Sequence, residues 1–201
     1  MGRANSERSE FAPFWEGVGP DKKIKEWGAV CELLRSMHAR GDYRYKLPIE
    51  SVDDDPPDCV IQDSGGVRVG VEVTEFVDQE VIEMCERAQN EREQSVYREW
   101  TAEAVREKVA EILKSKDAKA QRWRGLYGKA ILVIYTDEIV LQSPELFPML
   151  DAGGFPRPQN IAEAYFICSY EPTPTLSDNE KPYPYTRLRF ERDHVVGVRL
   201  R

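Results

Sequence analysis

The sequence predicts an α/β protein with a central mixed sheet flanked by helices. Two observations carry this prediction. Helical and strand periodicities alternate along the 201 residues, and the segment KAILVIYTDE (129–138) is a continuous apolar run rich in β-branched residues, typical of a strand buried on both faces. The length allows one sizeable core, so we expect a single domain over 1–201, with an N-terminal extension (1–21), a core (22–138) and a C-terminal elaboration (139–201).

The first elements follow from periodicity and punctuation. Apolar residues recur at helical spacing over 22–40, and Gly41 ends that run as a helix C-cap does. The segment YRYKLPI (43–49) alternates apolar and polar residues but contains Pro48, which predicts a strand at the edge of the sheet. The acidic, proline-containing ESVDDDPP that follows predicts a loop, and it leads into a strand pair over 58–76.

The second half of the chain alternates helices and strands in the same way. The polar region 79–119 reads as mostly helical, and an apolar stripe in its second half predicts packing on the sheet. After the buried strand, Ser143 as N-cap and Pro144 at the first helical position predict a short helix. We expect a further strand in AEAYFICSY (162–170), a long loop, and a terminal hairpin in 186–201 that turns near residues 192 and 193.

Composition excludes several classes of protein. No segment approaches the roughly 18 unbroken apolar residues of a membrane span, and the N-terminus has no apolar signal core, so we expect a cytoplasmic protein with no membrane partner. The four cysteines have no metal-binding spacing and read as reduced, buried thiols.

The charge is unevenly distributed along the chain. The net charge is −8, but 50–99 holds fifteen acids against four arginines, whereas 105–129 holds eight basic residues against three acids. An acidic centre beside a basic flank is suited to binding metal and phosphate together. Two solvated faces would have the same composition, and both interpretations stay open.

Two acidic residues interrupt the predicted strand pair. The runs DCVIQD and VRVGVEVTEF flank a Ser-Gly-Gly loop, and if Asp63 and Val67 flank that loop, Asp58 lies directly opposite Glu72. A slip of one residue would move the apolar set to the polar face, so the hydrophobic pattern independently supports placing both acids on one face. Directly opposed carboxylates are unfavourable unless a cation lies between them. Gly70, on the same face as Glu72, is expected to leave room for a ligand.

Other known motifs are missing from the sequence. There are two histidines, no P-loop and no dinucleotide fingerprint, so zinc-protease, NTP-dependent and NAD-dependent chemistry have no support. The segment QRWRGLYGK (121–129) has a composition that can stack bases and neutralise phosphates. More often such a segment is a helix end capped by Gly125 with Trp123 packed inward, and this is the interpretation we favour.

PPDCVI…VGVEVTEF resembles the core motif of the PD-(D/E)xK nuclease superfamily, which has the restriction-endonuclease-like fold. That motif is an Asp after Pro at the start of one strand, then Glu or Asp, any residue, and Lys on the next. Pro57 and Asp58 match its first half, and Glu72 begins the second half, which ends in Thr74 instead of Lys. The resemblance covers about 22–138 and implies an αβββαβ core, here with a C-terminal β-hairpin extension.

The resemblance implies metal-dependent hydrolysis of phosphodiesters in nucleic acid, most often DNA. Asp58, Glu72 and the backbone carbonyl of Val73 would hold Mg²⁺ or Mn²⁺. Thr74 stands at the position of the catalytic lysine, and a neutral hydroxyl does not replace a cation. A lysine that has migrated within the site would restore the charge, and the candidates are Lys108 and Lys129, for which an exposed helix residue and a solubilising strand end are the alternative interpretations.

Two further readings stay open. In the first, the chain is a catalytically inactive protein of the nuclease fold that acts as an interaction or regulatory module, through self-association or a protein partner. Its support is the missing motif lysine and the acidic composition. In the second, the fold is a different α/β fold in which the acidic pair is accidental.

Overall fold

The computed structural model of the chain describes residues 21–51, 56–77, 100–137, 140–168 and 183–191. Within these residues it is an α/β structure with one six-stranded mixed sheet, three α-helices and a short 3₁₀ helix. The elements in chain order are α1 (Asp21–Ala39), β1 (Tyr45–Ser51), β2 (Cys59–Asp63), β3 (Arg68–Glu75), α3 (Ala102–Ala120), η1 (Gln121–Trp123), β4 (Lys129–Thr136), α4 (Ser143–Asp151), β5 (Ile161–Cys168) and β6 (Tyr185–Arg187).

The strands lie in the sheet in their chain order, from β1 to β6. β1, β2 and β3 are antiparallel neighbours joined by short connections. β3, β4 and β5 run parallel, and β6 pairs antiparallel with β5. Parallel strands need a crossover, and α3 and α4 supply the two crossovers of this sheet.

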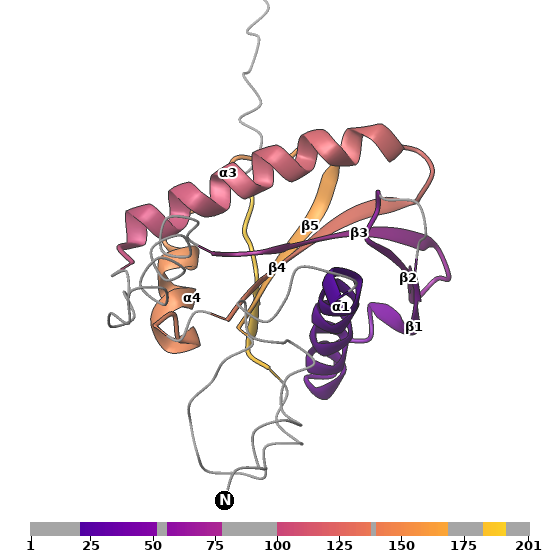
Figure 1. Cartoon of the computed structure of the whole chain (residues 1–201), viewed down its shortest axis with the longest axis horizontal. Helices are drawn as coiled ribbons and strands as arrows, with labels where there is room; N and C mark the ends of the chain where they lie inside the picture. The colour runs from indigo at the N-terminus through magenta and orange to yellow at the C-terminus, as the bar shows by residue number, and fades with distance from the viewer. Residues whose placement is uncertain (1–20, 52–55, 78–99, 138–139, 169–182, 192–201) are drawn as a thin grey trace, which may run out of the picture.

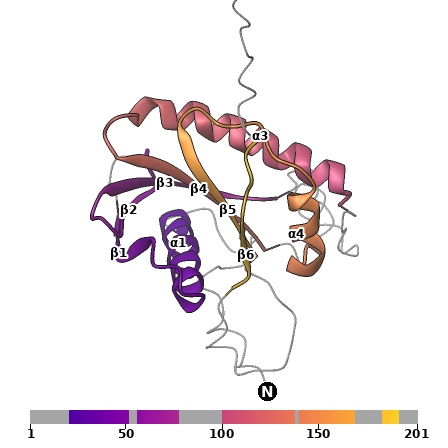
Figure 2. The same cartoon turned by 180° about the vertical axis from the view of Figure 1, so that it is seen from behind.

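Helices cover both faces of the sheet. α1 lies against one face, and α3 crosses the other face with α4 beside it (Figures 1 and 2). Since successive side chains of a strand point to opposite faces, each buried strand contributes to two cores. On β4, Ile131 and Val133 belong to the core under α1, whereas Leu132 and Ile134 belong to the core under α3.

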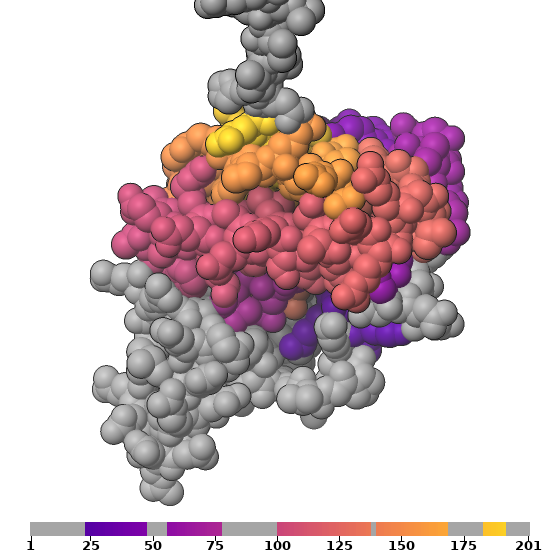
Figure 3. Space-filling view, turned by 90° about the horizontal axis from the view of Figure 1, so that it is seen from above, coloured from indigo at the N-terminus to yellow at the C-terminus, as the bar shows by residue number. Residues whose placement is uncertain are grey.

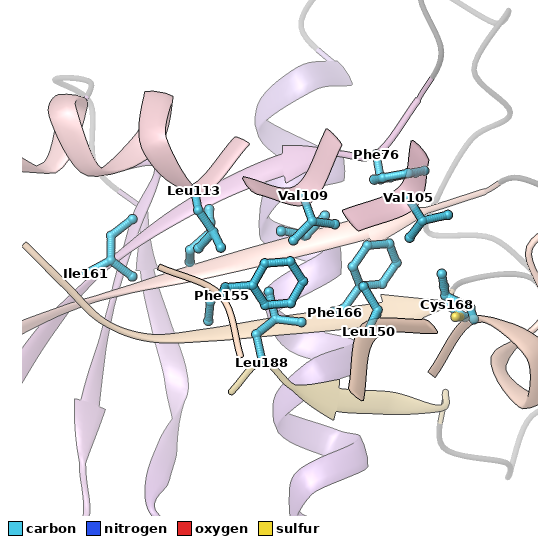
Figure 4. Packing of buried hydrophobic residues seen from close by; sticks show 14 of the residues in the cluster. Phe76, Val105, Val109, Leu113, Leu150, Phe155, Ile161, Phe166, Cys168 and Leu188 are labelled. Carbon is cyan, nitrogen blue, oxygen red and sulfur yellow. The ribbon is translucent and has the colours of Figure 1, made fainter. Parts of the chain in front are cut away.

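The core under α3 depends on the apolar stripe of that helix. Val105, Val109 and Leu113 recur at intervals of four residues and are buried. Figure 4 shows these side chains above Phe155 and Phe166, with Phe76 at one end of the row. In the space-filling view from above, α3 forms a continuous band across this side of the molecule (Figure 3).

The prediction of an α/β protein is confirmed, and so are most of its described elements. The helix over 22–40 corresponds to α1, and the strand with Pro48 is β1 at the edge of the described sheet. β4 is buried on both faces, as its continuous apolar run predicts. One cap is wrong: Gln142, and not Ser143, is the N-cap of α4, so Ser143 and Pro144 both lie in the first turn.

Three other expectations fall partly outside the described residues. These are the first half of the helical region (79–99), most of the long loop before residue 183, and the turn of the terminal hairpin beyond residue 191. Within the described part, the last strand is β6, which begins at Tyr185 and joins the sheet beside β5. None of the described helices has the length and apolar character needed to cross a bilayer.

Candidate functional site

The hairpin of β2 and β3 has the register that brings the two carboxylates together. Cys59 pairs with Val71 and Ile61 with Val69, as the apolar alternation predicts. Asp58 directly precedes β2, and its backbone N–H donates at 3.0 Å to the carbonyl of Val71, the residue that the ladder pairs with Cys59. The pairs of this ladder end at Cys59 and Val71, so Asp58 and Glu72 lie next to its last pair, and the directly opposed pairing expected for them is not among its pairs.

The two carboxylates are buried and differ in their partners. The side chain of Glu72 is 0% exposed and that of Asp58 is 2% exposed. Asp58 Oδ2 accepts a hydrogen bond from the Val73 N–H at 2.6 Å, which orients the carboxylate and leaves Oδ1 for another partner. Burial raises the pKa of Glu72, and the neighbouring Asp58 charge adds to this, against the opposing effect of the ammonium groups described next.

Two lysines of α3 reach these carboxylates. Lys119 Nζ lies 3.1 Å from Glu72 Oε2 and 3.6 Å from Asp58 Oδ1, so one ammonium bridges both acids. Lys116 Nζ lies 3.2 Å from the same Glu72 oxygen and donates to the Val73 carbonyl at 3.0 Å. The site thus combines two buried carboxylates with two ammonium groups, and their formal charges cancel.

Lys116 and Lys119 were not among the residues expected at this site, although the sequence carries a signal for one of them. The inner stripe of α3 runs through Val109 and Leu113 to Ala120, and Lys116 falls in phase with it, where a packed helix normally has an apolar residue. Lys119 follows one turn later, and residues three apart lie on the same side of a helix. A lysine within an apolar stripe indicates a buried acid on the facing element.

Thr74 and Lys108 lie near the two carboxylates but do not contact them. Both line a hollow of about 200 Å³ between β3 and α3, together with Glu111, Ser115 and Lys116 among others. Lys108 forms no hydrogen bond or ion pair with either acid in the described part of the chain. Of the two lysines considered as substitutes for the motif lysine, Lys108 is on the same side of the sheet as Glu72 but lies about two helical turns before Lys116, which makes the contact.

Lys129 lies on the other face of the sheet. It begins β4 in phase with Ile131, so its side chain is on the α1 side, whereas Glu72 faces α3. Its ammonium binds Glu163 Oε1 at 3.2 Å and lies 4.8 Å from the centre of the Tyr45 ring. The structure therefore does not bring Lys129 to Asp58 and Glu72, because the alternation of strand side chains points it away from them.

The space above Gly70 is occupied by Trp123. A Cβ at Gly70 would lie 2.3 Å from Cζ3 of the indole, so the ring covers this glycine directly. The expectation that Gly70 leaves room for a ligand is therefore wrong. Trp123 is 3% exposed and packs in the α3-side core, which agrees with the inward-packed interpretation of the segment 121–129.

The residues present fit a hard divalent cation of the Mg²⁺ type. Mg²⁺ is typically held by one or two carboxylates, with waters and substrate phosphates completing the shell. Asp58 Oδ1, Glu72 Oε2 and the Val73 carbonyl already converge on ammonium groups, so cations are stabilised at this position. Glu72 Oε1 is buried and has no hydrogen-bond partner in the described residues, which leaves one more oxygen for a cation. No group of three or more His, Cys, Asp or Glu side chains suited to a metal occurs in the described residues, so any ion held here would take the remaining ligands from backbone, water or substrate.

Comparisons with protein-family models, with curated proteins and with solved structures found no significant match to this chain.

Proposed function

We propose that the protein is a metal-dependent phosphodiester hydrolase of the PD-(D/E)xK type that acts on nucleic acid, with DNA as the expected substrate. The observation that carries this proposal is the convergence of two ammonium groups from α3 on two buried carboxylates of the β2–β3 hairpin. The order of α1, β1 to β3, α3 and β4, with helices on both faces of the sheet, supports a restriction-endonuclease-like core.

In this proposal the chain itself supplies three functions. Asp58, Glu72 and the Val73 carbonyl hold the cation, and the hydrogen bond from the Val73 N–H fixes the orientation of Asp58. Lys116 and Lys119 supply the positive charge that Thr74 does not. Their side chains are 20% and 25% exposed and carry flexible stems, so each ammonium can turn from a carboxylate to a bound phosphate.

A bound Mg²⁺ would supply charge neutralisation at the phosphate and would lower the pKa of the attacking water. In this proposal the ammonium groups of the two lysines stabilise the negative charge that develops on the phosphate in the transition state. Removing one such electrostatic contact typically lowers kcat by about 10²–10³-fold, which sets the size of the effect to look for.

The experiment measures cleavage of single- and double-stranded DNA with Mg²⁺ or Mn²⁺. We expect activity in the wild type, none in Asp58→Ala or Glu72→Ala, and a loss of about 10²-fold or more in Lys119→Ala. Lys114→Ala is the matched control, because this lysine lies on the same helix but is exposed, and its activity should stay at the wild-type level. Equal activity of Lys119→Ala and Lys114→Ala would contradict the assigned role of Lys119.

One observation favours a second candidate, a catalytically inactive nuclease-fold protein that acts as an interaction or regulatory module. The two ammonium groups already neutralise both carboxylates, so the cluster can serve as an ion-pair contact that fixes α3 on the hairpin. This candidate predicts no divalent-ion binding by calorimetry and no cleavage. It also predicts a loss of thermal stability in Lys119→Ala that exceeds the loss in Lys114→Ala.

A further inference from the structure

A second polar cluster lies on the α1 side of the sheet, opposite Asp58 and Glu72. Its centre is Glu163 of β5, which is contacted by cations from β4, from β6 and from the turn before β1. Arg44 Nη1 lies 3.2 Å from Glu163 Oε2, Lys129 Nζ lies 3.2 Å from Oε1, and Arg187 Nη2 lies 3.4 Å from Oε2. The Tyr165 hydroxyl also donates to Glu163. We call Arg44, Lys129, Glu163 and Arg187 the basic cluster.

An irregularity in the sheet is what places Glu163 in this cluster. Ala130 pairs with Ile161, but the next residue of β4, Ile131, pairs with Glu163, so Ala162 has no partner on β4. Ile161 packs in the core under α3, whereas Tyr165 and Ile167 pack under α1. Without the extra residue, strand alternation would keep Glu163 in phase with Ile161 and would turn it toward α3. Bulges of this kind re-aim side chains and are frequent beside functional sites.

The cluster carries more positive than negative charge. Arg44 also binds Asp42, through Nε at 2.9 Å and Nη2 at 2.6 Å. Three cations therefore face two carboxylates, and the surplus stands out in a chain with a net charge of −8. Glu163 remains ionised at neutral pH: burial opposes its charge, but the Tyr165 hydrogen bond and the charges of Arg187 and Lys129 hold its pKa below the ordinary value.

The donors of the cluster are only partly used within the described residues. The Arg187 side chain is 51% exposed and meets Glu163 through a single nitrogen, so the other edge of its guanidinium has no acceptor in the described chain. Lys129 has one acceptor, Glu163 Oε1, and is 28% exposed. A ligand with several acceptor oxygens and more than one negative charge would satisfy both cations.

We propose that the basic cluster is a binding site for a phosphate oxyanion, carried either by inorganic phosphate or by a nucleic-acid backbone. Arginine offers two parallel N–H donors to a phosphate, and lysine adds a point charge. Glu163 holds the three cations together and competes with the ligand for them. The site lies on the opposite face from Asp58 and Glu72, so it does not depend on hydrolysis at those residues.

The first test measures phosphate binding by calorimetry and by thermal shift at constant ionic strength, with chloride as the reference salt. We expect a phosphate-specific rise in Tm of the wild type and a Kd at least tenfold weaker in Arg187→Ala. Arg189→Ala is the matched control, because Arg189 is more exposed than Arg187 and forms a surface ion pair with Asp151. The Kd of this variant for phosphate should stay within twofold of the wild-type value. Glu163→Gln removes the competing carboxylate and should bind phosphate several-fold more tightly.

The second arm identifies the source of the phosphate. A short single-stranded oligonucleotide is titrated without divalent ions into an Asp58→Ala background, with and without Arg187→Ala. Binding at least tenfold tighter than inorganic phosphate, and weakened by Arg187→Ala, indicates a nucleic-acid backbone, whereas binding of inorganic phosphate alone indicates a small ligand. The proposal is overturned if phosphate and chloride act alike on both the wild type and Glu163→Gln, or if Arg187→Ala and Arg189→Ala weaken binding equally.

Discussion

The contact between Gly70 and Trp123 yields the most direct prediction about packing. In Gly70→Ala the new methyl group would lie 2.3 Å from Cζ3 and 2.6 Å from Cη2 of the indole, against an optimum of about 3.5–4.0 Å between carbon atoms. The indole is 3% exposed, so it has little room to move within its core. Overpacking of this kind costs about 1–3 kcal/mol in the free energy of unfolding.

A double-mutant cycle isolates the clash. Trp123→Ala alone should cost about 3–5 kcal/mol, the usual range for a buried tryptophan. If the two changes were independent, their costs would add to about 4–8 kcal/mol. Because the methyl group introduced by Gly70→Ala would partly fill the space that the indole leaves, we expect the double variant to cost no more than Trp123→Ala alone.

The assay is urea denaturation followed by circular dichroism, with Gly65→Ala as the control. Gly65 lies in the turn of the same hairpin, and the nearest atom to its added methyl is the side-chain Oδ1 of Asp63 at 3.3 Å, so its effect should stay within about 0.5 kcal/mol. Additive costs in the cycle, or a Gly70→Ala variant as stable as the wild type, would refute the packing argument. A displacement of the indole in Gly70→Ala would also disturb Lys119, which lies about one helical turn before Trp123.

Two further predictions concern pH and the α4 region. The folded pKa of Glu72 is raised, mainly by burial, so compared with Glu72→Gln the wild type is most stable below the ordinary pKa of 4.5 and loses that advantage as the pH rises through the folded pKa. The folded pKa of Glu163 is lowered, so its contribution to stability is present above pH 4.5 and is lost as the pH falls through the folded pKa. We would measure, by chemical denaturation from pH 3 to 8, the difference in free energy of unfolding between the wild type and each of Glu72→Gln and Glu163→Gln. This difference should change with pH in opposite directions for the two variants, and a change in the same direction would contradict the assignment. Arg106→Ala removes donors to the carbonyls of Leu150 (3.1 Å) and Gly154 (2.9 Å), at the end of α4 and just beyond it, and should cost about 1–3 kcal/mol in the free energy of unfolding, measured by thermal denaturation. The exposed Arg122→Ala should be near neutral, and equal Tm values of the two variants would exclude a stabilising role for these hydrogen bonds.

The hairpin register is the part of the candidate site that could be read from the chain. Its turn, Ser-Gly-Gly, and its apolar alternation permit registers of one parity, and the structure has the expected pairs. Local constraints were sufficient here because residues paired across a tight turn are close in the sequence. Asp58 and Glu72 each adjoin the last of these pairs, Cys59 with Val71, but they are not themselves a pair of the ladder.

The identity of the lysines at the site could not be predicted, because it depends on contacts between residues far apart in the chain. Lys116 lies 44 positions after Glu72, and its contact is set by how α3 crosses the sheet. The side to which Lys129 points could not be read from β4, because a strand that is apolar on both faces gives no alternation to distinguish them. The same ambiguity hid the irregularity at Ala162 that turns Glu163 toward α1.

By itself, the sequence determined the α/β class, most of the described elements and the register of the hairpin that carries the two acids, since each of these rests on local periodicity and turn chemistry. Only the tertiary structure decided which cations meet which acids, that Trp123 covers Gly70, and that polar clusters lie on both faces of the sheet. The physical reason is that helix docking and strand irregularities fix the direction of long side chains, and these depend on packing across the whole core.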